Sequence, residues 1–125
     1  MAQDPPGTEP TLIKAESIYD VVHDVITPTV APIVARLVTG GLSVHELAEQ
    51  LPVERRTVSN TLSWLRRYGL VYYEQKGKSR VYHTTPGTAS MRANGELHLR
   101  FRTRDGGQAS LVFPPTRLLR KPRTR

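Results

Sequence analysis

The stretch VERRTVSNTLSWLRRYGLVYY, residues 53–73, combines a regular apolar pattern with many hydrogen-bond donors. On a helix that turns by about 100° per residue, Val58, Leu62 and Leu65 share one side. The opposite side is polar and carries arginine with no acidic side chain among it. This division predicts a helix over residues 55–68, stopped by Gly69, that buries one side and offers the other to a partner.

The segment before this helix has the signals of a second, shorter helix. SVHELAEQL, residues 43–51, opens with a capping box in which Ser43 and Glu46 satisfy each other's backbone N–H groups. Only a short turn separates the two helices. The arrangement therefore predicts a helix-turn-helix.

Two further helices are expected nearer the N-terminus. Residues 29–39 fit a helix that Thr29 caps and Gly40-Gly41 ends. Residues 12–26 also have helical spacing, and Pro28 stops that helix because proline disfavours helical geometry in the residue before it. One apolar stripe follows the i, i+3, i+4, i+7 pattern on it: Ile18, Val21, Val22 and Val25.

After Gly69 the pattern changes from helix to strand. LVYYEQ and RVYHTT, joined by KGKS, predict a β-hairpin with a basic turn. Residues 86–95 are interpreted as a linker, and residues 96–115 as a second hairpin whose alternation puts Leu97, Leu99 and Phe101 on one face. Residues 1–11 are proline-rich and predict a disordered leader, and residues 116–125 a basic tail.

The charge is distributed unevenly along the chain. The net charge of +7 arises because residues 1–53 carry seven acidic and two basic side chains, whereas residues 54–80 carry two acidic and seven basic. Residues 92–125 add nine basic side chains against two acidic ones. This asymmetry favours a polyanion as the partner of the second half, although a solvated basic surface remains the alternative.

Several classes of protein are disfavoured by the composition. The 125 residues include no cysteine, which excludes disulfides, thiolate metal sites and cysteine nucleophiles. We find no nucleophile–base pair, carboxylate cluster, phosphate loop or metal-ligand spacing, so we expect neither an enzyme nor a bound cofactor or metal. No apolar run has membrane-spanning length and no signal peptide is visible, so we expect a cytoplasmic protein associated with the nucleoid, without membrane contact.

The polar side of the helix over residues 55–68 suits the major groove of double-stranded DNA. The groove admits an α-helix, and Arg and Asn can bond guanine and adenine edges in pairs. Arg56 and Asn60 lie on that side. The basic hairpin that follows would contact phosphates or a minor groove.

These residues resemble a known family. LSVHELAEQLPVERRTVSNTLSWLRRYGLVYYEQKGKSRVYHTT is similar to a winged helix-turn-helix domain of the ArsR/MarR-like superfamily, over about residues 28–85. The similarity rests on the Ser-x-x-Glu-Leu-Ala start, the internal Thr-Val-Ser, the Leu-x-x-Leu-x-x-x-Gly-Leu-Val exit and the basic wing. It implies an α+β fold of about four helices plus a β-hairpin wing, here with an additional C-terminal β-hairpin.

The resemblance also implies a function. It implies a homodimeric, sequence-specific transcriptional regulator, repressor-like, that reads a near-palindromic site. The helix over residues 55–68 would contact the groove, the wing would contact phosphates, and the start of the preceding helix would meet the DNA backbone. Carried over by position and by the polar side of the helix, the DNA-binding residues are Arg55, Arg56, Thr57, Ser59, Asn60, Ser63, Arg67, Lys76, Lys78, Arg80, Ser43 and His45.

Three departures from the family pattern have consequences. Pro52 replaces the usual glycine of the turn, and Glu54 replaces a Ser or Thr cap. The C-terminal hairpin stands where many relatives have a dimerisation helix, so the stripe Ile18, Val21, Val22 and Val25 becomes the candidate dimer contact, with intramolecular core as its alternative. Other functions stay open: non-specific architectural or partition DNA binding, RNA binding, or a protein-binding module that uses residues 96–113.

Overall fold

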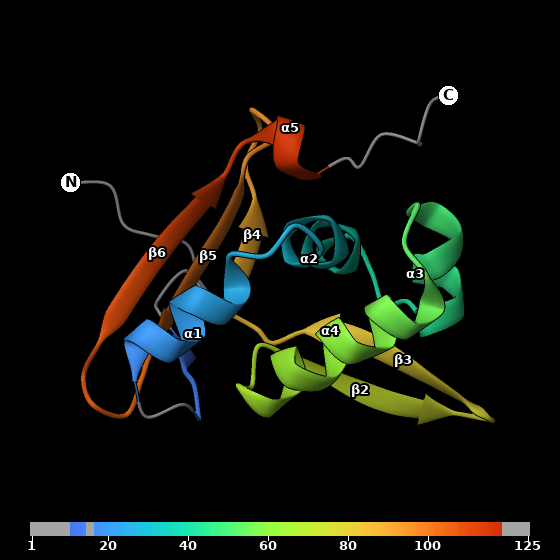
Figure 1. Cartoon of the computed structure of the whole chain (residues 1–125), viewed down its shortest axis with the longest axis horizontal. Helices are drawn as coiled ribbons and strands as arrows, with labels where there is room; N and C mark the ends of the chain where they lie inside the picture. The colour runs from blue at the N-terminus through green and yellow to red at the C-terminus, as the bar shows by residue number, and fades with distance from the viewer. Residues whose placement is uncertain (1–10, 15–16, 119–125) are drawn as a thin grey trace.

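The computed structural model of the chain describes residues 11–14 and 17–118. The expected leader at residues 1–10 and the end of the expected tail, residues 119–125, lie outside the described residues. Figure 1 shows helix α2 between two units, a sheet on one side and a helical pair with a hairpin on the other. In chain order the elements are β1 (Thr11–Leu12), α1 (Ile18–Val25), α2 (Val30–Val38), α3 (Val44–Gln50), α4 (Arg55–Arg67), β2 (Val71–Lys76), β3 (Ser79–Thr84), β4 (Ala89–Met91), β5 (Leu97–Arg102), β6 (Gln108–Phe113) and α5 (Pro115–Leu118).

The helix-turn-helix and its wing form as the sequence predicts. The capping box starts α3: Glu46 N donates to Ser43 Oγ at 3.1 Å, and Ser43 N donates to Glu46 Oε1 at 2.9 Å. Gly69 adopts φ +83° just after α4, a left-handed conformation that glycine reaches without steric cost and that ends the helix. Strands β2 and β3 then pair antiparallel over their full length to make the wing.

The second hairpin belongs to a four-stranded sheet. Strand β5 lies at its centre, with β6 antiparallel along one side and β4 and β1 sharing the other. Strand β4 corrects the interpretation of residues 86–95 as a linker, because Ala89–Met91 pair with Leu97–Leu99. A three-residue strand has too few residues to show an alternating pattern, which is why the sequence does not reveal it.

One apolar core joins the two units through α2. Seven of the nine residues of α2 are buried, and the helix packs against β3, β4 and α5. From the sheet, Leu97 and Phe101 have no exposed area and Leu99 has 2%. These three side chains are therefore core, which corrects the idea that they offer an apolar docking surface for a protein partner.

The N-terminal segment also differs from the expected helix over residues 12–26. The helix begins only at Ile18, where the Ser17 side chain accepts a hydrogen bond from Tyr19 N at 3.2 Å. Thr11 and Leu12 instead pair parallel with Phe101 and Arg102. A free strand edge in the distant sheet supplies backbone partners that outweigh the local helical pattern.

The apolar stripe of α1 faces the interior of its own chain. Val21 and Val25 are fully buried, and Ile18 and Val22 are partly buried against the same core. The burial of Val21 and Val25 favours the alternative, in which the stripe is intramolecular core, whereas the dimer contact of these four residues stays a prediction.

Two smaller corrections concern α2 and the C-terminus. Thr29 makes no side-chain cap to α2; its hydroxyl lies 3.1 Å from that of Thr61 on α4. The expected tail begins inside the fold, because Leu118 of α5 is only 4% exposed. Within residues 11–14 and 17–118 no single helix is long and apolar enough to span a bilayer, and α1 with α2 reaches that length only as a pair bent by 89°.

Candidate nucleic-acid interface

Helix α4 separates a buried side from a polar side as the sequence predicts. Val58, Leu62 and Leu65 have no exposed area, and Thr61 has 4%. Thr61 is the one polar residue on this side, and the hydroxyl of Thr29 satisfies its hydrogen bonding. The exposed side carries every residue of α4 that the sequence nominates for DNA: Arg55, Arg56, Thr57, Ser59, Asn60, Ser63 and Arg67.

The start of α4 has little capping of its own. Glu54 is the N-cap residue, but its side chain makes no capping hydrogen bond. The carboxylate still lies near the positive end of the helix dipole, where a negative charge is favourable. The position of α4 therefore depends mainly on its buried side and its packing against α3.

A hollow of about 540 Å³ brings α3, α4 and the wing together. We call it the wing hollow. It is open to solvent, and hydroxyl, imidazole and cationic groups from three separate elements surround it. Six of the nominated residues line it: Ser43, His45, Arg55, Ser59, Lys78 and Arg80.

The residues of the wing hollow from α3 have internal partners. The hydroxyl oxygen of Ser43 accepts a hydrogen bond from the backbone N–H of Glu46, so the capping box holds the Ser43 side chain in place at the hollow. The guanidinium of Arg55 contacts Nδ1 of His45, and Nε2 of His45 lies 3.4 Å from Glu49. These contacts hold the guanidinium of Arg55 beside α3 at the rim of the wing hollow.

Tyr73 of β2 holds two arginines at the root of the wing. The guanidinium of Arg66 lies 4.8 Å from the centre of its ring, and that of Arg80 lies 4.6 Å away. Arg66 belongs to α4 and Arg80 to β3, so the ring connects the helix with the wing. A cation on an aromatic face is held in place while its charge still reaches solvent.

The tip of the wing carries exposed lysines around a tight turn. Lys76 and Lys78 flank Gly77, whose φ of +61° requires the left-handed conformation. Neither lysine side chain has a hydrogen bond or ion pair among the residues that the structure describes. They extend the positive charge of the wing hollow away from α4.

A second hollow adds candidates that the sequence did not indicate. It has a volume of about 610 Å³ and includes Ser63 and Arg67 of α4 together with Lys14 and Arg66. Lys14 reaches this place because its backbone N–H donates to the carbonyl of Tyr68 at 3.3 Å. Basic side chains thus continue along α4 from the wing hollow to its C-terminal end.

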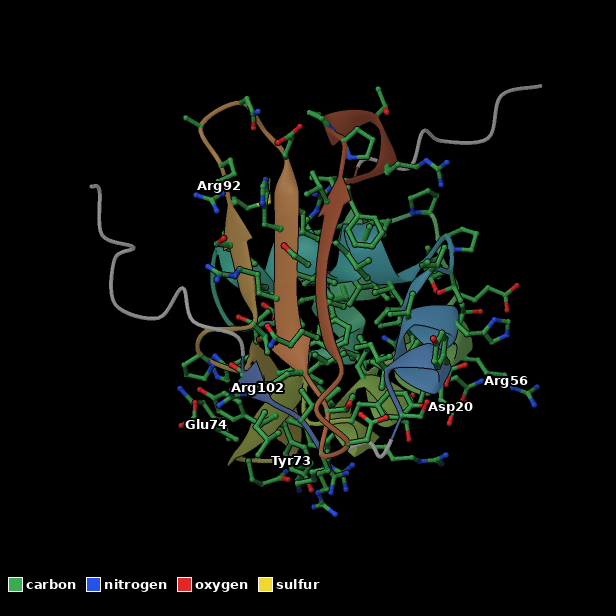
Figure 2. The ribbon with its side chains drawn as sticks, turned by 90° about the vertical axis from the view of Figure 1, so that its left-hand side faces the viewer. Asp20, Arg56, Tyr73, Glu74, Arg92 and Arg102 are labelled. Atoms are coloured by element: carbon green, nitrogen blue, oxygen red, sulfur yellow. The ribbon has the colours of Figure 1, made fainter. Side chains whose placement is uncertain are left out.

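Arg56 projects away from the sheet. Figure 2 shows it at the opposite side of the view from Arg92, which follows β4, and Arg102, which ends β5. Arg56 and Asn60 are exposed, and no hydrogen bond or ion pair engages their side chains within the described part of the chain. Their donors are available for an external partner.

Three groups outside the hollows have displaced pKa values. The Tyr68 hydroxyl donates to Asp24, and this bond, with burial and the negative charge of Asp24, raises the pKa of Tyr68 to about 12. In the sheet, a hydrogen bond with His98 lowers the pKa of Glu96. Bonds from Thr103 and Gly107 lower the pKa of Asp105.

Comparison with known proteins gives a coherent result for about half of the chain. No protein-family model and no curated protein sequence matches. Among solved structures, a possible transcriptional regulator for arsenical resistance is 31% identical, over 54% of this chain and 70% of that one, with a TM-score of 0.50.

Two further structures agree with this match. An ArsR-like transcriptional regulator from Rhodococcus sp. RHA1 is 26% identical over 54% of this chain and 62% of that one, with a TM-score of 0.52. The transcriptional repressor BigR from Xylella fastidiosa is 29% identical over 54% of this chain and 67% of that one, with a TM-score of 0.50.

These similarities agree with the geometry: a helix pair with a solvent-exposed polar face on its second helix, followed by a basic β-hairpin. The fold class predicted from the sequence is confirmed. The chain belongs to the ArsR-like family of winged helix-turn-helix transcriptional regulators, which bind DNA.

Proposed function

We propose that this protein is a homodimeric repressor that reads a near-palindromic site on double-stranded DNA, with α4 in the major groove. The observation that carries the proposal is the wing hollow, where basic and polar side chains from α3, α4 and the wing converge. Six residues nominated independently of the structure meet there. BigR, one of the similar structures, is described as a repressor.

The residues divide into two roles. Arg56 and Asn60 are exposed without internal partners, so they supply the hydrogen bonds to base edges. Arg55, Lys76, Lys78 and Arg80 surround the wing hollow or the wing tip and meet phosphates. Phosphate contacts fix position and affinity, whereas base contacts discriminate between sequences.

A two-fold arrangement of the protein would place two copies of α4 in successive major grooves, about 34–36 Å apart. The site would then be an inverted repeat whose half-site spacing reports the distance between the two helices. The protein would act at the nucleoid, where such sites occur.

The test is selection from a random duplex pool, with sequencing of the bound DNA at two salt concentrations. We expect an enriched inverted repeat. Strong, salt-sensitive binding with no enriched sequence would instead make the protein an architectural binder. No binding at low salt would remove DNA as the partner of this face.

Two sets of variants separate the two roles. Arg56→Ala combined with Asn60→Ala should relax sequence preference by roughly 1–3 kcal/mol for each lost base contact. Lys78→Ala should weaken binding to all sequences alike and reduce the slope of log K against log salt by about 0.9. If the double variant keeps full discrimination between sites, the assignment of Arg56 and Asn60 is wrong.

A further inference from the structure

Strand β6 forms an outer edge of the sheet. Among the described strands it pairs with β5 alone, and Figure 2 shows β5 between β4 and β6. Among residues 11–14 and 17–118, no backbone hydrogen bond joins the outer side of β6 to another segment. Strand β6 therefore presents a row of unpaired donors and acceptors.

The hydrogen bonds of the hairpin determine which residues form that row. In an antiparallel pair, successive residues alternate between bonding to the neighbour and pointing away from it. Thr103 N donates to Gly107 O at 2.8 Å, so the bonded positions continue at Phe101 with Ala109. The backbone groups that point to the outer edge are therefore those of Gln108, Ser110 and Val112.

The other side of β5 confirms this alternation independently. Arg100 N donates to Thr88 O at 2.8 Å, and Ile13 N donates to Arg102 O at 2.8 Å. The backbone N–H and C=O groups of Arg100 and Arg102 thus point away from β6, as the assignment requires. Ser110 and Gln108 lie opposite these two residues in the register of the hairpin. The backbone groups of Ser110 and Gln108 therefore point away from β5.

The sequence and register of β6 lack the charges, prolines and bulges that prevent strands from pairing, although α1 packs beside the start of the strand. Natural sheets protect their edges with lysine, proline, bulges or a covering segment. QASLVF has no charge and no proline over six residues, and it pairs with β5 without a bulge. Val112 is 49% exposed, although it is a large apolar residue in a strand.

Helix α1 packs against β6 and adds apolar surface near it. Ile18 approaches the start of the strand, where a Cβ on Gly107 would lie 2.7 Å from Ile18 Cβ. The outer side of α1 exposes Tyr19 by 82%, and Ile26, which follows the helix, is 59% exposed.

We infer that β6 pairs antiparallel with β6 of a second copy of this chain, which joins two sheets into one continuous sheet. A two-fold axis at Ser110 places Ser110 opposite the same residue of the second copy, and Gln108 opposite Val112. Every edge donor then meets an acceptor, as a self-complementary interface requires. The absence of charge on β6 removes like-charge repulsion across the seam.

This inference deepens the proposed function, since it locates the contact that makes the regulator a dimer. It replaces the buried stripe of α1 with a surface that is available in the folded chain. The dimer contact and the reading of DNA use different residues, so separate measurements test them.

The first test is the molar mass of the full chain without DNA, measured by light scattering after size exclusion. We expect a dimer for the unmodified protein. Ser110→Pro removes one edge N–H from each copy but leaves the β5–β6 bonds, because the backbone of Ser110 points outward. We expect its dissociation constant to rise roughly tenfold to a hundredfold.

Ser110→Ala is the matched control. It shortens the same side chain and keeps the N–H, so it should remain dimeric. Val112→Lys provides a second route, because it places a charge at the seam while it keeps every backbone donor. We expect Val112→Lys to weaken the dimer as well. This variant keeps the inference testable if the proline variant fails to fold.

Either of two results would overturn the inference. One is a monomer for the unmodified chain at every concentration tested. The other is a Val112→Lys variant and a folded Ser110→Pro variant that both dimerise as tightly as the unmodified chain.

Binding of the same variants to DNA separates this inference from the proposed function. A monomeric Ser110→Pro variant should still bind a single half-site and lose tight binding to the inverted repeat. Sequence-specific binding by a wholly monomeric protein would reject the β6 contact and keep the reading role of α4. A dimer that binds DNA without sequence preference would keep the β6 contact and reject the reading role of α4.

Discussion

At the scale of single residues, Tyr68 connects the end of α4 to α1. Its hydroxyl donates to the Asp24 carboxylate, and the bond favours the protonated tyrosine. The pKa is raised on folding from 10.0 to about 12. The stabilisation is therefore complete below pH 10 and is lost as the pH rises toward about 12.

Tyr68→Phe should destabilise the protein by about 1–2 kcal/mol at neutral pH, because Asp24 loses a donor. Denaturant unfolding measures the loss. In an absorbance titration of the unmodified protein, one of the five tyrosines should ionise later than the rest. Asp24→Asn should restore an ordinary midpoint, and a titration that this variant leaves unchanged would contradict the assignment.

At the scale of elements, the connection between α2 and α3 lies tightly against the wing. Leu42 and Tyr82 exchange two backbone hydrogen bonds of 3.1 and 2.8 Å, which fix the wing to the helical pair. Beside them, a Cβ on Gly41 would lie 2.4 Å from the ring of His83 and 2.7 Å from Val81. The neighbouring Gly40 has no atom within 4 Å of such a Cβ.

This contrast provides a matched pair of variants. Gly41→Ala should cost roughly 1–3 kcal/mol, because a methyl group must displace part of β3. It should also weaken DNA binding, because β3 carries Arg80 of the wing hollow. Gly40→Ala should change neither property, and equal effects of the two variants on unfolding and binding would argue against the close contact.

At the scale of the whole molecule, α2 makes the two units interdependent. Its buried residues contact the wing strand β3 on one side and β4 and α5 on another. Trp64, the single tryptophan, lies in α4 and reports on the helical unit alone. The shared core implies that the sheet and the helix-turn-helix unfold in one transition.

Leu99→Ala, a substitution in the sheet, tests whether the two units unfold in one transition. We expect a loss of roughly 2–5 kcal/mol, because Leu99 is 2% exposed and leaves a cavity. Trp64 fluorescence and circular dichroism should shift together to lower denaturant. Arg102→Ala, on the exposed side of the same strand, is the control and should have little effect. An unchanged Trp64 transition beside a shifted dichroism signal would mean that the units unfold separately.

The local signals in the sequence were sufficient for the parts of the fold that depend on neighbours along the chain. The capping box at Ser43 and Glu46 and the two sides of α4 follow from spacings of three and four residues. The sequence could not reveal β1, because the partner of Thr11 is Phe101, far along the chain. The apolar stripe on α1 could be recognised in the sequence, but the residues that cover Val21 could not.

The candidate site shows the same limit. Residues on α4 and the wing could be nominated from the sequence, because both elements follow from local pattern. Lys14 could not, since β1 carries it to α4. Nor could the placement of Arg66 and Arg80 on Tyr73, which depends on how the wing folds back on the helix.

The parallel pairing of β1 with β5 also bears on the order in which the protein is completed during synthesis. Thr11 and Leu12 leave the ribosome early, but Phe101 and Arg102, which hold them, are made much later. Until then α2 lacks the cover of β4 and α5, and the segment that precedes Lys14 lacks its strand partner. A nascent chain that already contains α4 and the wing is therefore still an incomplete regulator, and only translation of the last strands allows it to mature.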